Sequence, residues 1–372
     1  MLTVTPRLSL RNGALAFLLL NSVAAAQAPR WAADGTDEPI GALPVYSVLL
    51  LDTLSQEHVV GTLFDLRRDF DIVDPPSRTI AVGGSFSDFQ QFGEVLISFN
   101  EAVMYGSDGA VYAIGKSLTS EAHGLNVGGT IVGFAANALA GDYAAFRYKT
   151  KTWTTLPGLG GSMGNATAVN DLEFVVGYDG DGGGNSKAVY WTPDNQLRVP
   201  DLGDVSSEFL GVNNRNVAVG YAAVGPIGEH CAISYELANG HLTVLPFPFA
   251  TNGGTYAQAI NERGEVVGIS SQFGAYQPVR WKMGNVTAMA VLPGEGTGGA
   301  RANDINNHGV IVGNSNWGKA VIWLGGAIYD LNELTPGAPG FLTNAVAISD
   351  EGVIACHLDN GTPRAVLLVP QG

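Results

Sequence analysis

Short runs of β-branched and aromatic residues, separated by glycine-rich turns, recur along most of the chain. Residues 257–271 read AQAINERGEVVGISS, and residues 302–316 read ANDINNHGVIVGNSN. Alternating apolar and polar positions predict β-strands, and beyond the N-terminus glycine or proline interrupts the apolar stretches before they reach three helical turns. The pattern therefore predicts an all-β protein.

The line that begins at residue 257 belongs to a longer series of repeats. Its anchor positions are Gln90, Asn126, Asn170, Asn213, Asn261, Asn306 and Ser349, with Gln90 and Ser349 as the weaker members. Successive anchors lie 36 to 48 residues apart. A period near 44 is too long for one coil of a strand solenoid and matches one four-stranded propeller blade.

Each repeat contains the signals for antiparallel strands. Small and apolar residues before the anchor predict a first strand. The N-x-x-G sequence that follows, as at Asn261 and Gly264, predicts a turn in which Asn accepts a backbone hydrogen bond and Gly adopts a left-handed conformation. Glu173 takes the glycine place in one repeat and predicts a different loop type there. The second strand contains a glycine, such as Gly268, which predicts the close approach of another backbone, that of the neighbouring blade.

A third strand carries a large aromatic residue at an equivalent place in five repeats. These residues are Tyr148, Trp191, Tyr235, Trp281 and Trp323. We interpret them as blade-to-blade packing in preference to an aromatic platform for sugars. Hairpin turns then lead to a fourth strand that ends in leucine, as at Leu202 and Leu292.

These signals predict a β-propeller spanning residues 44–370 as a single domain. Seven blades fit best, with six or eight as alternatives, because residues 55–88 form either an irregular insertion or a degenerate blade. The last repeat stops after its third strand, whereas residues 44–54, PVYSVLLLDTL, resemble an isolated fourth strand. We therefore predict that this N-terminal strand completes the last blade and closes a monomeric ring.

The line A-x-x-I-N-x-x-G-x-V-V-G, followed by A-V-x-W and a Leu-Gly-rich linker such as LPGLGGSMGNATAVN, resembles the HAF repeat of bacterial probable extracellular repeat proteins. The resemblance covers roughly residues 44 to 370. It implies export and a propeller-like fold, and it carries no catalytic residue over to this chain.

The N-terminus has the pattern of a secretory signal. Arg7 and Arg11 precede an apolar run over residues 14–20 and small residues at 24 and 26. We predict a signal peptide over residues 1–26, a flexible leader over 27–43, and a secreted or periplasmic location. The run is too short to span a bilayer. The formal net charge of −15 argues against a nucleic-acid partner or an anionic membrane surface.

Few residues in the sequence indicate a catalytic or metal-binding role. Residues 160–164 match the G-x-S-x-G nucleophile motif but lie in a linker, where no strand and helix are expected to flank it. Asp179, Asp181 and Asn185 have a spacing that would suit calcium, but the downstream Glu of an EF-hand is missing, and we favour a flexible inter-strand loop over a calcium site. Apart from this calcium alternative, no cofactor is expected. Cys231 and Cys356 occupy different strands of distant repeats, so we predict buried, unpaired thiols.

Strand order predicts which face of the ring binds. The loops after strands two and four are long and variable and share one face, which we call the loop face. The turns after strands one and three are short and share the other, the turn face. Because variable loops on a rigid scaffold usually carry binding, we predict the following ligand-binding residues on the loop face. They are Asp142, Asp179, Asp181, Glu208, Glu229, Glu295, Trp317 and Glu333.

Together the sequence predicts a secreted, non-enzymatic repeat protein that serves as a binding or surface-interaction scaffold for an unidentified glycan or protein. An extracellular polysaccharide hydrolase or lyase on a propeller scaffold is the alternative, and a carboxylate pair at the channel mouth with one raised pKa would favour it. A structural domain of an envelope assembly is the third possibility.

Overall fold

The computed structural model describes residues 43–51, 58–66, 79–87, 90–92, 95–97, 100–106, 110–115, 119–136, 142–203, 205–225, 228–248, 253–272, 275–296 and 298–371. The predicted signal peptide and nearly all of the predicted leader lie outside these residues. Within the described chain, no helix is long and apolar enough to cross a membrane.

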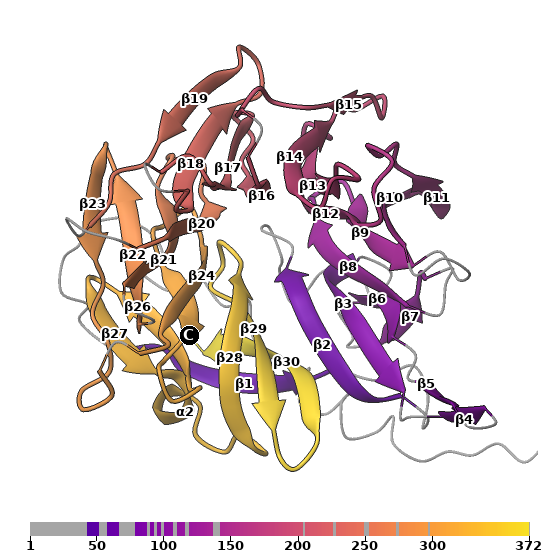
Figure 1. Cartoon of the computed structure of the whole chain (residues 1–372). Helices are drawn as coiled ribbons and strands as arrows, with labels where there is room; N and C mark the ends of the chain where they lie inside the picture. The colour runs from indigo at the N-terminus through magenta and orange to yellow at the C-terminus, as the bar shows by residue number, and fades with distance from the viewer. Residues whose placement is uncertain are drawn as a thin grey trace, which may run out of the picture.

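Seven four-stranded antiparallel sheets surround a common axis in the described residues and form a seven-bladed β-propeller (Figure 1). Blade 1 contains β2 (His58–Leu66), β3 (Thr79–Ser87), β6 (Asn100–Gly106) and β7 (Val111–Ala113). Blade 2 contains β8 (Ser120–Leu125), β9 (Ile131–Ala136), β10 (Tyr143–Lys149) and β11 (Thr152–Thr155). Blade 3 contains β12 (Gly164–Val169), β13 (Val175–Gly180), β14 (Ser186–Trp191) and β15 (Leu197–Arg198).

The remaining blades follow the same order from the axis outward. Blade 4 contains β16 (Ser207–Val212), β17 (Val217–Ala222), β18 (Cys231–Glu236) and β19 (His241–Val244). Blade 5 contains β20 (Thr255–Ile260), β21 (Val266–Gln272), β22 (Ala275–Lys282) and β23 (Asn285–Ala288). Blade 6 contains β24 (Arg301–Ile305), β25 (Ile311–Asn314), β26 (Ala320–Leu324) and β27 (Ala327–Asp330), and the short helix α2 (Leu331–Leu334) follows it. Blade 7 contains β28 (Phe341–Ile348), β29 (Ile354–Asp359), β30 (Pro363–Gln371) and β1 (Val45–Leu50).

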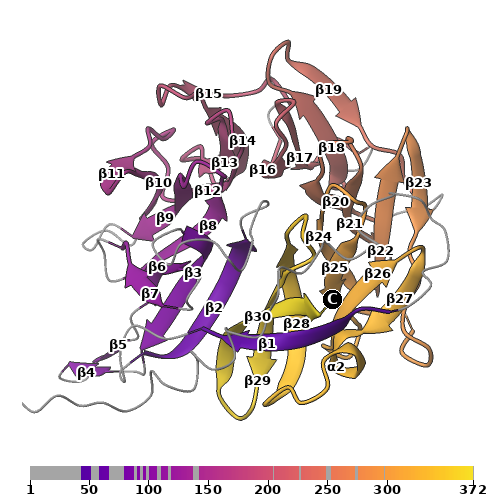
Figure 2. The same ribbon diagram turned by 180° about the vertical axis from the view of Figure 1, so that it is seen from behind.

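The two ends of the described chain share blade 7, as the sequence predicted. β1 pairs with β30 in an antiparallel register that runs from Val45 opposite Gln371 to Leu50 opposite Val366. Figure 2 shows β1 lying beside the last strands before the chain continues into β2 of blade 1. Tyr46, only 1% exposed, packs into the core between blades 6 and 7. The ring is therefore closed by backbone pairing and by a buried aromatic side chain.

Blade 1 departs from the repeat line. Its first two strands, β2 and β3, come from the segment 55–88, and the anchor assigned to Gln90 is wrong. Gln90 lies in β4 (Gln90–Phe92), which forms a separate hairpin with β5 (Val95–Ile97) between strands two and three of the blade. The repeat line fails here because residues 67–78, which connect β2 to β3, do not carry the N-x-x-G turn.

The anchor asparagines hold each tight turn and also bond to the next blade. In blade 6, Asn306 Oδ1 accepts the N–H groups of His308 and Val310 at 3.0 Å each, and its Nδ2 donates to the Ser349 carbonyl of blade 7 at 3.0 Å. The same donation to the following anchor carbonyl is made by Asn126, Asn170, Asn213 and Asn261. These five buried side chains form a circumferential chain of hydrogen bonds, which we call the asparagine belt.

Glu173 adopts the turn conformation that glycine adopts elsewhere, so the prediction of a different loop type is wrong. Its φ is 68°, close to the 78° of Gly264. The strain is offset by its carboxylate, which accepts hydrogen bonds from Asn126 and Thr130 of the preceding blade and pairs with Lys149 at 3.0 Å. Burial alone would raise the pKa of Glu173, but these contacts outweigh burial and lower it.

In blades 2 to 6 the glycine of the second strand faces the first strand of its own blade, which corrects the prediction that a neighbouring blade approaches it. A methyl group on Gly220 of β17 would overlap the carbonyl oxygen of Glu208 in β16. The equivalent glycines are Gly133, Gly177, Gly268 and Gly313. The close approach accompanies a β-bulge in each first strand, and the bulged residues line the central channel of the ring.

The large third-strand residues pack between blades, as predicted. Trp191, Trp281 and Trp323 are at most 3% exposed. Trp191 lies against Val132 and Ala145 of blade 2, and its Nε1 donates to the Pro157 carbonyl at 2.8 Å. Cys231 and Cys356 are buried and unpaired, also as predicted.

Candidate functional site

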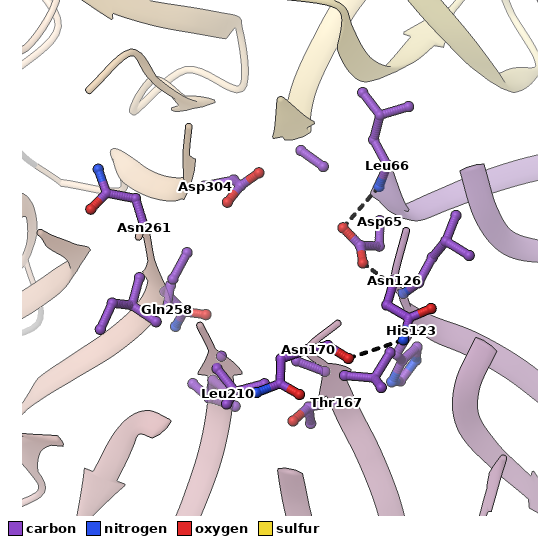
Figure 3. A pocket seen from close by; sticks show the side chains of 18 of the residues that line it. Asp65, Leu66, His123, Asn126, Thr167, Asn170, Leu210, Gln258, Asn261 and Asp304 are labelled. Atoms are coloured by element: carbon purple, nitrogen blue, oxygen red, sulfur yellow. Dashed lines mark hydrogen bonds between the residues drawn. The ribbon is translucent and has the colours of Figure 1, made fainter. Parts of the chain in front are cut away.

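A ring of bulged residues lines the axial channel. In every blade the register of the innermost strand shifts by one residue, and the residue left without a partner faces the axis (Figure 3). The ring consists of Phe64, His123, Thr167, Leu210, Gln258, Asn303 and Val346. Together with neighbouring residues it encloses a cavity of about 150 Å³. Several water molecules fit this volume.

Polar side chains in the channel connect adjacent blades. Asp65 accepts the N–H of Leu125 at 2.8 Å. Asp304 accepts the N–H of Ile348 at 2.9 Å. The Thr167 hydroxyl donates to the carbonyl of Phe209 in the next blade at 2.8 Å. Each bond joins one innermost strand to the next, so these groups hold the ring together where its strands converge.

The turn-face mouth of the channel carries a second belt. The residue after each anchor donates its backbone N–H to the side chain of its counterpart in the next blade. The series runs through Val127, Asp171, Asn214, Glu262, Asn307 and Asp350. Both oxygens of Asp171 are engaged, one by Val127 N–H and one by Asn214 Nδ2. The acidic residues at this mouth are therefore structural acceptors.

Aromatic residues gather at the loop-face end of the channel. The ring centroids of Phe64 and His123 are 4.6 Å apart, those of His123 and Phe134 5.4 Å, and those of Phe134 and Tyr143 5.1 Å. His123 also contacts the Glu121 carboxylate at 2.9 Å. This row extends from the channel lining outward to Tyr143, which is 40% exposed.

A second group, the Glu208 cluster, lies on the loop face of blades 3 to 5 and consists of Tyr178, Glu208, Tyr221, His230 and Tyr256. Glu208 and Tyr221 are opposite each other on β16 and β17, and their side chains are hydrogen-bonded. His230 Nδ1 lies 2.9 Å from the Tyr256 hydroxyl. The rings of Tyr221, His230 and Tyr256 have centroids 4.7 to 5.4 Å apart. All five side chains are half-buried and remain within reach of solvent.

The electrostatics of the Glu208 cluster reflect a carboxylate withdrawn from water. Burial raises the pKa of Glu208, and hydrogen bonds from Tyr221 and Ser186 offset part of the effect. Burial, followed by the charge of Glu208, raises the pKa of Tyr221. Burial also raises the pKa of Tyr178, with a further contribution from the charges of Glu208 and Glu121. The cluster thus combines aromatic surface with a half-buried carboxylate, on which the charge of His230 also acts.

Of the eight predicted binding residues, Glu208 lies in this cluster. Asp179 and Glu295 are buried and accept hydrogen bonds from backbone N–H groups of the chain itself. Asp179 is 5% exposed and accepts the Leu159 N–H at 3.1 Å. Glu295 is 5% exposed, accepts the Trp317 N–H at 3.1 Å and pairs with Lys319 at 3.3 Å. Burial raises the pKa of Asp179, although the Leu159 hydrogen bond opposes it.

The remaining predicted residues are spread over the loop face. Trp317 is 65% exposed in the β25–β26 loop, and Glu333 is exposed on α2. Asp142 and Glu229 are half-buried at the starts of β10 and β18. The structure does not bring these four residues into one group with Glu208.

The carboxylates of the predicted calcium site, Asp179 and Asp181, have different hydrogen-bond partners. Asp181 Oδ1 accepts the N–H groups of Gly183 at 2.7 Å and Asn185 at 3.2 Å, so it caps its own loop. Asp179 bonds to the linker before β12 instead. Among the described residues no group of three His, Cys, Asp or Glu side chains is arranged to hold a metal ion.

Residues 160–163 form an irregular linker and Gly164 begins β12, so the G-x-S-x-G motif stands before a strand and not before a helix. This placement lacks the strand-turn-helix geometry that a nucleophile elbow requires.

The sequence interpretation missed most of the Glu208 cluster, although one signal was available. An aromatic residue directly follows the second-strand glycine in three consecutive repeats, at Phe134, Tyr178 and Tyr221. Strand alternation places this residue opposite the first-strand position that holds Glu121, Asn165 and Glu208. The recurrence could have been read as a surface patch, but its grouping across three blades depends on ring curvature.

Comparison with known proteins gives likeness in fold. No family model matches the chain, and no curated protein matches it. Among solved structures, YCF48 bound to D1 peptide is 10% identical with a TM-score of 0.48, covering 93% of this chain and 100% of its own. A streptogramin B lyase is 11% identical with a TM-score of 0.48, covering 88% and 98%. TolB from Acinetobacter baumannii is 12% identical with a TM-score of 0.42, and the match spans 73% of this chain but only 60% of TolB. Identities this low show likeness in fold alone.

Proposed function

We propose that the chain is an exported, non-enzymatic binding module whose recognition surface is the loop face, centred on the Glu208 cluster. One observation carries this proposal. Half-buried aromatic rings and a desolvated carboxylate gather on the loop face, whereas the polar side chains around the turn-face mouth are bonded to one another in belts. Groups that are not needed to hold the ring are the ones available to a ligand.

Other features support the same surface. Tyr143, Met163, Val224, Trp317 and Phe341 are large apolar residues that are 36% or more exposed, and each lies in a loop or at a strand start on the loop face. Exposed apolar side chains in the loops of a rigid scaffold are available for contact with a ligand. We further propose, from the repeat line and the N-terminal pattern, that the chain groups with HAF-repeat proteins and acts outside the cytoplasm.

A binding screen tests the proposal. The chain from residue 27 onward would be applied to glycan and peptide arrays, and hits would be measured with Tyr221→Ala and with the matched control Tyr112→Ala. Tyr112 is 45% exposed on β7, the outermost strand of blade 1. Losing one aromatic contact should weaken binding about tenfold for Tyr221→Ala only. Equal affinity of the two variants would exclude the Glu208 cluster as the recognition surface.

An extracellular polysaccharide hydrolase or lyase is the second candidate, and the raised pKa of Glu208 favours it because a general acid must hold its proton near neutral pH. The test is incubation with acidic and neutral polysaccharides, followed by measurement of new reducing ends and unsaturated products. Product formation that disappears in Glu208→Gln would establish the enzyme and overturn the non-enzymatic proposal.

A further inference from the structure

Building on the proposed function, we propose that the ligand of the loop face is a peptide that presents a cationic side chain, lysine or arginine, to the Glu208 cluster. The cluster would hold this cation between the Glu208 carboxylate and the surrounding aromatic rings.

No lysine or arginine pairs with Glu208 among the described residues, and the nearby charge that acts on it is that of His230. The Glu208 carboxylate is bonded by two neutral hydroxyl groups, those of Tyr221 and Ser186. Other shielded glutamates of the ring have a cation of their own. Glu265 contacts Arg280 at 3.0 Å and Lys282 at 3.1 Å. A carboxylate removed from water gains most from a partner of opposite charge, and a ligand can supply it.

The aromatic rings of the Glu208 cluster also favour a cationic ligand. Tyr221 and Tyr256 meet at 69°, and His230 and Tyr256 meet at 86°, so half-buried rings of different orientation surround one point. The face of a tyrosine ring carries negative charge density and attracts ammonium and guanidinium groups. The chain already uses this contact elsewhere, because the Arg301 guanidinium lies 4.7 Å from the centroid of the Tyr276 ring.

The excess of acidic side chains around the cluster favours a cationic ligand as well. The loop-face ends of blades 2 to 4 carry acidic side chains that outnumber the basic ones in the described residues. The acids are Glu121, Asp142, Asp179, Asp181, Glu208 and Glu229. Lys187 is a base of this sector, and its ammonium group lies 3.9 Å from the Asp181 carboxylate. Such a sector attracts cationic ligands and repels anionic ones over a distance set by the ionic strength.

A neutral glycan fits the same aromatic surface less well. Its hydroxyl groups would offer Glu208 the kind of neutral donor that Tyr221 and Ser186 already provide. Neutral donors solvate a buried carboxylate but do not neutralise it. The observations therefore favour a cationic peptide, and glycan binding becomes an outcome of the test.

The experiment uses the chain from residue 27 onward and three probes in NMR titrations followed on the probe signals. The first is an acetylated, amidated pentapeptide with one central lysine among glycines. The second is the same peptide with the lysine side chain acetylated, which keeps the shape and removes the charge. The third is a neutral oligosaccharide, cellohexaose. Each is titrated against the unmodified chain, Glu208→Gln, Tyr221→Ala and Glu236→Gln.

We expect the lysine peptide to bind about tenfold more tightly than its acetylated form, the change expected from one desolvated charge pair. Glu208→Gln should remove this preference. Glu236→Gln removes the same charge from the turn face, at the exposed end of β18, and should leave the preference intact. Thermal melting of each variant confirms that the ring is folded.

Where at least one probe binds, three outcomes would overturn the cationic proposal. They are equal affinity for the two peptides, an unchanged preference in Glu208→Gln, and binding of cellohexaose alone. If cellohexaose binds and Tyr221→Ala weakens it, the proposed recognition surface stands while the ligand class is wrong. If none of the probes binds to the folded chain, the cationic proposal fails and the proposed function loses its support at this cluster.

Discussion

The asparagine belt makes a quantitative prediction for Asn306. This side chain is fully buried and makes three hydrogen bonds, two within its turn and one to the Ser349 carbonyl of the next blade. Asn306→Ala removes all three and leaves buried backbone groups without partners. At about 1 kcal/mol for each bond, the free energy of unfolding should fall by about 3 kcal/mol.

A serine at position 306 separates the two roles of the asparagine. Ser349 occupies the equivalent place in the last repeat, where its Oγ accepts the Val353 N–H at 3.2 Å. Asn306→Ser should therefore keep a bond within the turn while losing the bond to the next blade, and should cost about 1 kcal/mol less than Asn306→Ala. The difference between the variants measures the contribution of the turn.

Urea unfolding followed by tryptophan fluorescence is a suitable assay, because Trp191, Trp281 and Trp323 are buried at blade interfaces. For a domain of this size each kcal/mol shifts the Tm by about 1–2 °C, so Asn306→Ala should melt about 4 °C below the unmodified chain. Asn239→Ala, in an exposed turn, is the control and should change stability by less than about 1 kcal/mol. An Asn306→Ala variant that melts with the control would refute the reasoning about the belt.

Three further predictions concern the bulges, the closure and acid stability. Gly220→Ala should destabilise the ring by about 3 kcal/mol, because its methyl group would overlap the Glu208 carbonyl oxygen, and a variant with unchanged urea midpoint would contradict the bulge geometry. Tyr46→Ala should cost about 3 kcal/mol by emptying the space beneath the closing strand, and an unaltered Tm would show that β1 contributes little. Burial alone would raise the pKa of Glu265, but Arg280 and neighbouring donors lower it, so its contribution to stability is present above its unfolded pKa and is lost as the pH falls through the folded value. Glu265→Gln should accordingly lose less stability than the unmodified chain between about pH 5 and about pH 3, and parallel acid unfolding of the two would argue against this assignment.

Much of the architecture could be predicted because it depends on local signals. The N-x-x-G turn, the β-branched strands and the third-strand tryptophan each reflect a preference within a few residues, and their recurrence predicted seven blades. The closure by residues 45–50 also followed, since the last repeat has no fourth strand of its own and the N-terminal segment has no first three. Blade 1 was less clear because it lacks the turn on which the alignment depended.

The candidate site could be predicted only in part. The sequence indicated the loop face, and Glu208 was among its candidates, but Tyr178, Tyr221, His230 and Tyr256 were missed. These four residues come from three strands and one loop of three blades. Asp179 and Glu295 appeared equally suited to binding in the sequence, because a carboxylate in a loop looks the same whether it meets solvent or a backbone N–H.

The sequence by itself determined the strands, their order within each blade, the repeat period and the pairing of the chain ends, because alternation, turn chemistry and propensity act over short distances. Only the tertiary structure decided what each asparagine bonds beyond its own turn, which residues bulge toward the axis, and which polar groups of neighbouring blades meet. Those contacts join residues more than forty positions apart. They depend on how seven twisted sheets share the space around one axis, and no local preference specifies that.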